Sequence, residues 1–175
     1  MDAPFSRHNL NMPVTAETLR LHLDYSTWAS RRLVDQAAML TPAELIRDFE
    51  TSDKNVVGTL AHVFAADRVW LSRVKGEPPA TFITPEDRRL EVLQNDWPAL
   101  HQRWKLFTDQ LSDQDMLANI SYKDTKGNPY VSPLWQILLH LVNHGTHHRG
   151  QVSGFLRAMG HTPQPLDLIA YYRSL

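Results

Sequence analysis

Apolar side chains recur with the period of an α-helix in four long segments, and this periodicity constrains the fold more than any other feature of the chain. The segments span approximately residues 15–40, 55–75, 84–111 and 133–159. A helix with one apolar stripe must bury that stripe against a neighbour, and four such helices do so as a bundle. The sequence therefore predicts an all-α four-helix bundle, with residues 1–175 forming a single domain.

Capping side chains, prolines and a glycine mark the expected ends of these helices. Thr15 is a suitable N-cap for the first helix, and Thr41-Pro42 either ends that helix or begins a short turn. Thr84-Pro85-Glu86-Asp87 and Ser132-Pro133 each combine a capping side chain with a proline, which predicts the starts of the third and fourth helices. Gly160 is expected to end the fourth helix.

The remaining segments indicate smaller features. Pro98 lies inside the third helical segment and predicts a kink or a break after Asp96 or Trp97. Residues 120–123 and 129–131 flank a turn-rich pentamer with a glycine, which predicts either a small hairpin or an ordered loop. The tail, residues 167–175, is apolar enough to dock onto the body of the protein.

Composition excludes several classes of function. The chain has no cysteine, so it has no disulfide, no thiolate zinc site and no cysteine nucleophile. The formal net charge of −1 comes from 18 basic and 19 acidic residues mixed along the chain, which argues against nucleic-acid binding. No apolar run is long enough to span a membrane, and residues 1–13 contain no apolar signal core, so we expect a cytoplasmic protein.

Histidines cluster in the fourth helical segment. Four of the nine histidines, His140, His144, His147 and His148, fall within residues 140–148. On an ideal helix, His148 lies near the apolar stripe and His144 at its edge, whereas His140 and His147 lie toward the polar side. The inward pair is spaced i, i+4, which lets two imidazoles share one metal ion.

A metal ion on this pair needs a further ligand from another helix. His62 in the second helical segment is the strongest candidate, but it does not lie on the strongest apolar stripe of its own helix, so the wheel alone leaves its role open. The alternative is that the inward pair are ordinary polar residues of the core, although each ring buried without a partner costs about 1–3 kcal/mol. The other histidines show no such spacing and are expected at the surface: His8, His22, His101 and His161.

Two other polar residues are candidates for an active site. Asp67 falls on the apolar stripe of the second helix, where a carboxylate needs a partner, either an arginine such as Arg32 or a histidine N–H. Arg149 and Asn143 flank the inward histidines and are candidates for contact with a substrate, although an arginine near a helix surface is usually solvated. The chain lacks the His-Glu-x-x-His and Glu-x-x-His motifs of zinc proteases and di-iron bundles.

Several motifs together resemble the DinB/YfiT-like superfamily of metalloenzymes, over nearly the whole chain. They are Thr59-Leu-Ala-His62, Asp67-Arg-Val-Trp-Leu71, Asn143-His-Gly-Thr-His-His-Arg-Gly-Gln151, and Gly160 with Asp167-Leu-Ile-Ala-Tyr171. The resemblance implies a bundle of up-down-down-up topology that is commonly a homodimer. It also implies a divalent metal, zinc or nickel and less often iron, with His62, His144 and His148 as the ligands.

The resemblance narrows the function without fixing the reaction. Three protein ligands leave a coordination position open, as in catalytic rather than structural zinc sites. We therefore expect a metal-dependent enzyme acting on a small molecule, either a hydrolase or a thiol S-transferase, and a chain without cysteine would need a low-molecular-weight thiol to supply the sulfur. The alternative is a non-catalytic metal-binding or stress-associated scaffold.

Overall fold

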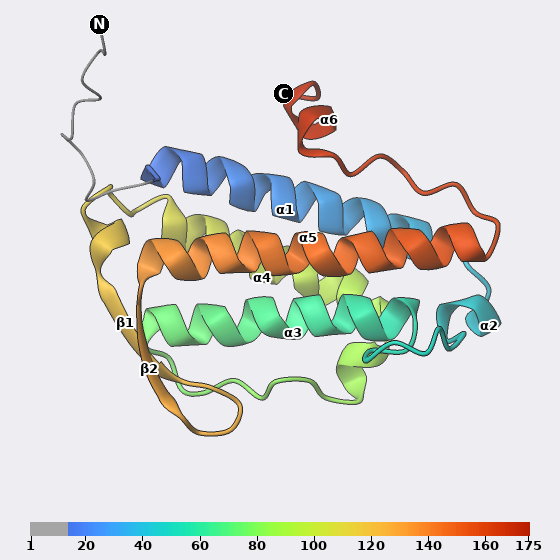
Figure 1. Cartoon of the computed structure of the whole chain (residues 1–175), viewed down its shortest axis with the longest axis horizontal. Coiled ribbons are helices and arrows are strands. Elements are labelled where there is room, and N and C mark those ends of the chain that lie inside the picture. The colour runs from blue at the N-terminus through green and yellow to red at the C-terminus, as the bar shows by residue number, and fades with distance from the viewer. Residues whose placement is uncertain (1–13) are drawn as a thin grey trace, which may run out of the picture.

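Four long helices form the body of the protein: α1 (Ala16–Ala37), α3 (Val56–Lys75), α4 (Leu90–Thr108) and α5 (Leu134–Ala158). The computed structural model describes residues 14–175. In Figure 1, α1 and α5 run in one direction and α3 and α4 in the other, so the order along the chain is up, down, down, up. The predicted all-α bundle and its topology are confirmed.

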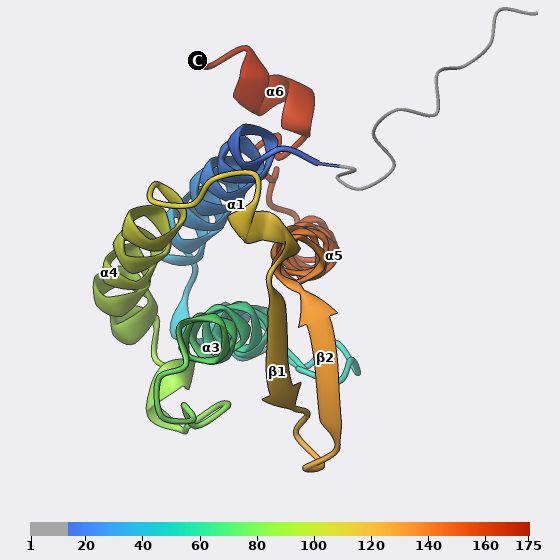
Figure 2. The same ribbon diagram turned by 90° about the vertical axis from the view of Figure 1, so that its left-hand side faces the viewer.

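The helices surround one apolar core. Helix α5 packs against both α1 and α3, and α4 closes the bundle by packing against the same two helices on the other side (Figure 2). All four helices contribute fully buried leucines, among them Leu19, Leu33, Leu60, Leu71, Leu93, Leu138 and Leu156. Burial of such side chains contributes about 1.5–3 kcal/mol each, which makes this core the main source of stability. Within residues 14–175, no helix combines the length and apolar character that crossing a membrane requires.

Shorter elements cover the ends of the bundle. Strands β1 (Asn119–Lys123) and β2 (Pro129–Pro133) pair antiparallel, so the segment before the last helix is a hairpin rather than an ordered loop. Helix α2 (Pro42–Leu45) is a single turn after α1, and short 3₁₀ turns occupy η1 (Glu86–Arg88) and η2 (Asp115–Leu117).

The tail docks onto α1, as its apolar residues predict. It ends in α6 (Leu168–Tyr172), where Tyr171 is buried with its ring centroid 5.8 Å from that of Tyr25 and 5.5 Å from that of Trp28. The Tyr25 hydroxyl donates a hydrogen bond of 2.8 Å to the carbonyl oxygen of Leu166, which holds the segment before α6.

Most of the predicted helix boundaries are confirmed by their capping contacts. The Thr15 hydroxyl accepts a hydrogen bond of 3.1 Å from the Thr18 N–H, and the Asn55 side chain accepts one of 2.8 Å from the Gly58 N–H. Gly76 ends α3 with a φ of 64°, a left-handed conformation that glycine adopts without steric cost. Gly160 follows α5 with a φ of 88°.

The prediction for the start of the third helix is wrong. Helix α4 begins at Leu90 instead of near Thr84, because the Asp87 carboxylate binds the Arg68 guanidinium and the Thr84 N–H and holds residues 84–88 in a tight turn. Helix α4 then continues through Pro98, so no break occurs there. Trp97 and Leu100 on either side of this exposed proline are buried, and their packing holds the helix together despite the missing N–H.

The predicted cap of the last helix is also wrong. Ser132 lies in β2, opposite Ile120, and the residue before α5 is Pro133, which provides no side-chain hydrogen bond. The Leu134 N–H instead donates a hydrogen bond of 2.9 Å to the carbonyl oxygen of Ala118, so the hairpin replaces the capping side chain.

One glycine permits a close approach that matters for the rest of the structure. A Cβ atom on Gly58, in the first turn of α3, would overlap the backbone carbonyl oxygen of Asp53. The absence of that atom allows the loop before α3 to lie directly against the helix. Because the clash would be with backbone, a side chain at this position requires the loop to move.

We therefore expect Gly58→Ala to lower the free energy of unfolding by about 1–3 kcal/mol, the usual cost of overpacking. The matched control is Gly154→Ala in α5, where an added Cβ meets no atom within 4 Å. That substitution should raise stability by about 0.5–1 kcal/mol, because alanine is the better helix former. Urea unfolding of both variants measures the difference, and equal effects would contradict the close approach.

Candidate metal centre

Three histidines from two antiparallel helices meet at one face of the bundle. His62 comes from α3, and His144 and His148 come from successive turns of α5. Each offers a ring nitrogen, and these three atoms lie within 4.8 Å of one another. The closest pair is Nε2 of His62 and Nε2 of His144, at 3.0 Å. We call these three residues the histidine cluster.

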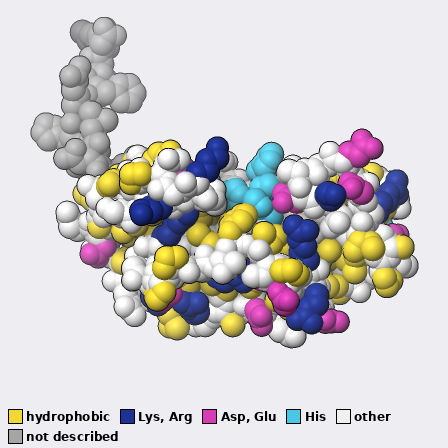
Figure 3. Space-filling model, turned by 90° about the horizontal axis from the view of Figure 1, so that it is seen from below, with side chains coloured by type: hydrophobic (Ala, Val, Ile, Leu, Met, Phe, Trp, Pro, Cys, Tyr) yellow, Lys and Arg dark blue, Asp and Glu magenta, His cyan; other side chains and the backbone are white. Residues whose placement is uncertain are grey.

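The neighbouring histidines follow the outward pattern expected from the helical wheel. His140 and His147 are exposed on α5, whereas His148 is buried and His144 is half-buried. The structure thus brings together the three histidines that the sequence analysis proposes as ligands. In Figure 3 the histidine side chains form a single group on this face, with acidic side chains beside it.

Side-chain oxygens lie beside Nδ1 of two of the three rings. Nδ1 of His62 lies 3.4 Å from a carboxylate oxygen of Asp53, and Nδ1 of His148 lies 2.8 Å from the side-chain oxygen of Gln151. The second Asp53 oxygen is 4.0 Å from Nδ1 of His148. A proton on each Nδ1, donated to these oxygens, leaves the Nε2 lone pair free for a metal.

Burial favours the neutral form of the two cluster histidines on α5. Burial, with the neighbouring histidines adding to it, lowers the pKa of His144 to about 3. Burial also lowers the pKa of His148, although the hydrogen bond to Gln151 acts in the opposite direction. Neutral imidazole is the form that binds metals, so this environment favours the ligand state.

The donor set fits a divalent transition metal. Three imidazole nitrogens suit zinc, nickel and iron, and three protein ligands leave at least one coordination position for another molecule. The ring of Phe82 meets the His62 ring edge-on, with centroids 5.4 Å apart, and provides an apolar wall on one side. The residues present can therefore hold a metal ion.

The sequence did not predict that Gln151 and Asp53 lie beside the histidine cluster. Gln151 follows His148 by three residues on the same helix, a spacing that places both side chains on one face and could have indicated the contact. Asp53 lies in the polar loop before α3, and only the close approach of that loop to Gly58 brings its carboxylate beside His62. No local pattern in the sequence signals that contact.

Asp67 lies inside the bundle, apart from the histidine cluster. Its carboxylate accepts a hydrogen bond of 2.9 Å from the indole N–H of Trp97 and lies 3.9 Å from Nε2 of His101. Arg32, the arginine expected as a partner, lies instead over the ring of Trp28, at 4.7 Å from its centroid, and His101 is the histidine beside the carboxylate. His101 is also not a surface residue, since its side chain is only 13% exposed and stacks on Trp97. His8 lies outside the described residues.

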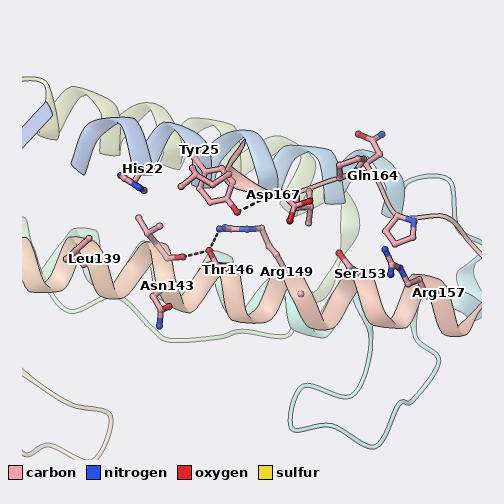
Figure 4. A pocket seen from close by; sticks show the side chains of 16 residues that line it. His22, Tyr25, Leu139, Asn143, Thr146, Arg149, Ser153, Arg157, Gln164 and Asp167 are labelled. Atoms are coloured by element: carbon pink, nitrogen blue, oxygen red, sulfur yellow. Dashed lines mark hydrogen bonds between the residues drawn. The ribbon is translucent and has the colours of Figure 1, made fainter. Parts of the chain in front are cut away.

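Arg149 is buried and only 1% exposed, in contrast to the solvated side chain expected. Figure 4 shows it extending from α5 toward Tyr25 on α1, and its guanidinium donates to the hydroxyls of Ser26 at 2.9 Å, Ser30 at 3.2 Å and Thr146 at 3.2 Å. These contacts join α5 to α1. They lie beside a cavity of about 830 Å³ between α1, α5 and residues 163–168, which Asn143 also lines.

Three comparisons place this structure among known proteins. The model of the DinB family matches residues 12–174. Protein DinB of Bacillus subtilis (strain 168) is 21% identical over 156 residues, which cover 85% of this chain and 90% of that protein. A crystal structure of a DinB-like protein from Bacillus cereus ATCC 10987 is 21% identical and has a TM-score of 0.64, covering 86% of this chain and 97% of that one. The structural match supports the fold.

The buried pair Asp67 and His101 generates a prediction about pH. Burial raises the pKa of Asp67 to about 7, although the bond from Trp97 opposes the shift. Burial lowers the pKa of His101 to about 4. Between about pH 4 and 7 the folded protein therefore holds a proton on Asp67 that the unfolded chain releases, so this residue makes stability fall as pH rises. Between about pH 4 and 6.5, His101 acts in the opposite direction.

We expect Asp67→Asn to remove the fall in stability between about pH 4 and 7. The free energy of unfolding of the variant minus that of the wild type should rise across this range, by roughly 1 kcal/mol per pH unit at most. Urea titrations at a series of pH values measure this difference. The control, Asp96→Asn at an exposed position of α4, should follow the wild type at every pH, and a parallel curve for Asp67→Asn would contradict the assignment.

Proposed function

This chain belongs to the DinB family, and we propose that it is a divalent-metal-dependent enzyme that acts on a small molecule, with His62, His144 and His148 as the metal ligands. The observation that supports this most is the convergence of three ring nitrogens, two of them on rings oriented from behind by Asp53 and Gln151. Zinc or nickel fits the donors best, and iron is the next candidate.

The chemistry follows from the donor set. A divalent cation with three protein ligands supplies Lewis acidity at its open position, which suits either hydrolysis or transfer of a thiol. For thiol transfer the sulfur must come from a low-molecular-weight cosubstrate, because the chain has no cysteine. Side-chain oxygens of Asp53 and Gln151 lie 3.4 and 2.8 Å from Nδ1 of His62 and His148, so a proton on each Nδ1 would leave each Nε2 free to bind the metal.

The same proposal includes a homodimer and a cytoplasmic location, which the sequence and the family resemblance lead us to expect. Sedimentation equilibrium of the metal-loaded protein tests the first and fractionation of cells tests the second. Neither property is needed for the histidine cluster to form, since all three of its residues come from one chain.

We expect the purified protein to contain about one divalent metal per chain, measured by elemental analysis. His144→Ala should lose most of this metal, because it removes one of three ligands, and should lose turnover in a screen of esters, amides and thiol transfer. The controls are His140→Ala and His147→Ala, which alter exposed histidines of the same helix and should keep the metal.

The outcomes separate the alternatives. Full metal occupancy in His144→Ala would remove this residue from the site. Equal losses of metal in His140→Ala, His144→Ala and His147→Ala would show that the exposed histidines hold metal as well, against the helical wheel. Metal that raises the melting temperature without supporting any turnover would favour the non-catalytic scaffold.

Asp53→Asn should weaken metal binding by roughly 10-fold, the usual effect of losing a carboxylate behind a histidine ligand. The matched control is Asp48→Asn in the same loop, where the carboxylate accepts a hydrogen bond from the Glu50 N–H and has no contact with the cluster. Competition with a chromogenic chelator gives both affinities. Unchanged affinity in Asp53→Asn would mean that its carboxylate does not support His62.

A further inference from the structure

A row of aromatic rings extends from the histidine cluster to the hairpin. The ring of His140 lies 5.6 Å from that of His144 and 5.5 Å from that of Trp70, measured between centroids. The Trp70 ring lies 4.8 Å from that of Tyr122 on β1, which lies 5.9 Å from that of Tyr130 on β2. We call His140, Trp70, Tyr122 and Tyr130 the aromatic row. It joins α5, α3 and both strands on one continuous surface.

Arg73 lies on this row between two of its rings. Its guanidinium carbon is 4.6 Å from the centroid of Trp70 and 5.3 Å from that of Tyr122. One of its N–H groups donates a hydrogen bond of 2.6 Å to the carbonyl oxygen of Lys123. Arginine has five such donors, and no carboxylate within residues 14–175 forms an ion pair with this one. N–H groups of Arg73 therefore remain for hydrogen bonds to a ligand.

The nearby acid is already occupied. Asp124 accepts hydrogen bonds from the backbone N–H groups of Lys126 and Asn128 at 2.8 and 2.9 Å, and from the Asn128 side chain at 2.9 Å. These bonds stabilise the hairpin turn and lower the pKa of Asp124. Its carboxylate is therefore held by the turn as an anion, and Arg73 is the cation beside it that lines the adjacent space.

That space is a cavity of about 310 Å³, small but within the range of ligand sites. It is lined by Trp70, Arg73, Tyr122, Asp124, Thr125 and Tyr130. Tyr130 is 49% exposed although its ring stacks on that of Tyr122, so part of the ring is open to a ligand. Aromatic walls offer stacking to a flat apolar group, and a guanidinium binds a carboxylate through two parallel hydrogen bonds.

We propose that this cavity binds a small molecule that carries a carboxylate next to an aromatic or flat apolar group. We further propose that this molecule is the substrate or thiol cosubstrate of the histidine cluster, and this second part rests on the proposed function. His62 and Arg73 are eleven residues apart on α3, about 16 Å along the helix. A molecule of that length, anchored at Arg73 and following the aromatic row, reaches the cluster.

The first part is tested with phenylacetate and its neutral counterpart phenylacetamide, added to metal-free protein. NMR signals of the Trp70 indole and the Arg73 guanidinium report binding. We expect both signals to shift with phenylacetate and its dissociation constant to be about fivefold lower than that of the amide, the effect of one exposed ion pair. Arg73→Gln should abolish this preference. Tyr130→Ala should weaken both ligands but keep the preference, because it alters only the stacking surface.

The matched control is Arg47→Gln. The Arg47 guanidinium also lies over a ring, 5.3 Å from the centroid of Phe49, but does not line this cavity, so the variant should behave as the wild type. Equal affinity for the two ligands, or a preference that survives in Arg73→Gln, would overturn the proposal. If Arg73→Gln does not fold, the deciding measurement is the comparison of the two ligands on the wild type and on Tyr130→Ala.

The same titration separates this inference from the proposed function. In His144→Ala the phenylacetate preference should persist, because the cavity contains no metal ligand. A protein that binds no metal but prefers phenylacetate would contradict only the proposed function. A protein that binds metal at the cluster but shows no preference would contradict only the carboxylate site.

Discussion

The antiparallel packing of α3 along α5 is the contact on which the site depends. Sequence separation puts His62 more than eighty residues from its two partners, and the bundle closes that gap because both helices must bury their apolar stripes against each other. Bringing the three histidines together therefore requires little ordering of the chain beyond that of the two helices. Its rings lie at the edge of an interface that the hydrophobic core already fixes.

Polar residues inside the bundle fall into two groups with different physical roles. Trp97 donates a hydrogen bond to Asp67 between α3 and α4, with His101 beside them, and Arg149 donates to hydroxyls of α1 and α5, so these side chains stabilise particular helix pairs. The histidine cluster differs, because one ring nitrogen from each of its three histidines lies within 4.8 Å of the other two. A hydrogen bond between Nε2 of His62 and Nε2 of His144 can satisfy that pair, whereas a bound cation would satisfy all three nitrogens.

Periodicity predicted the helices and the inward pair on α5 because both depend on residues close in sequence. The predictions failed where a distant contact decided the outcome. Asp87 does not begin a helix, because its carboxylate binds the Arg68 guanidinium. His101 is buried because it stacks on Trp97 in the groove beside α1. His62 was the strongest candidate for a third ligand, but its position off the strongest apolar stripe of its helix left its role open until the family resemblance, because the packing of α5 along α3 cannot be read from the local sequence.

The loop before α3 connects the start of that helix to the orientation of the His62 ring. Asn55 caps α3, Gly58 lets the loop lie against the first turn, and the carboxylate of Asp53 then reaches Nδ1 of His62 one turn further on. At the other end of α3 the hairpin is held by Arg73 and the rings around it. The face between loop and hairpin carries the histidine cluster and the aromatic row. Its shape is therefore set by the segments that hold the two ends of α3, so sequence changes in those segments can alter the ligands accepted without disturbing the bundle core.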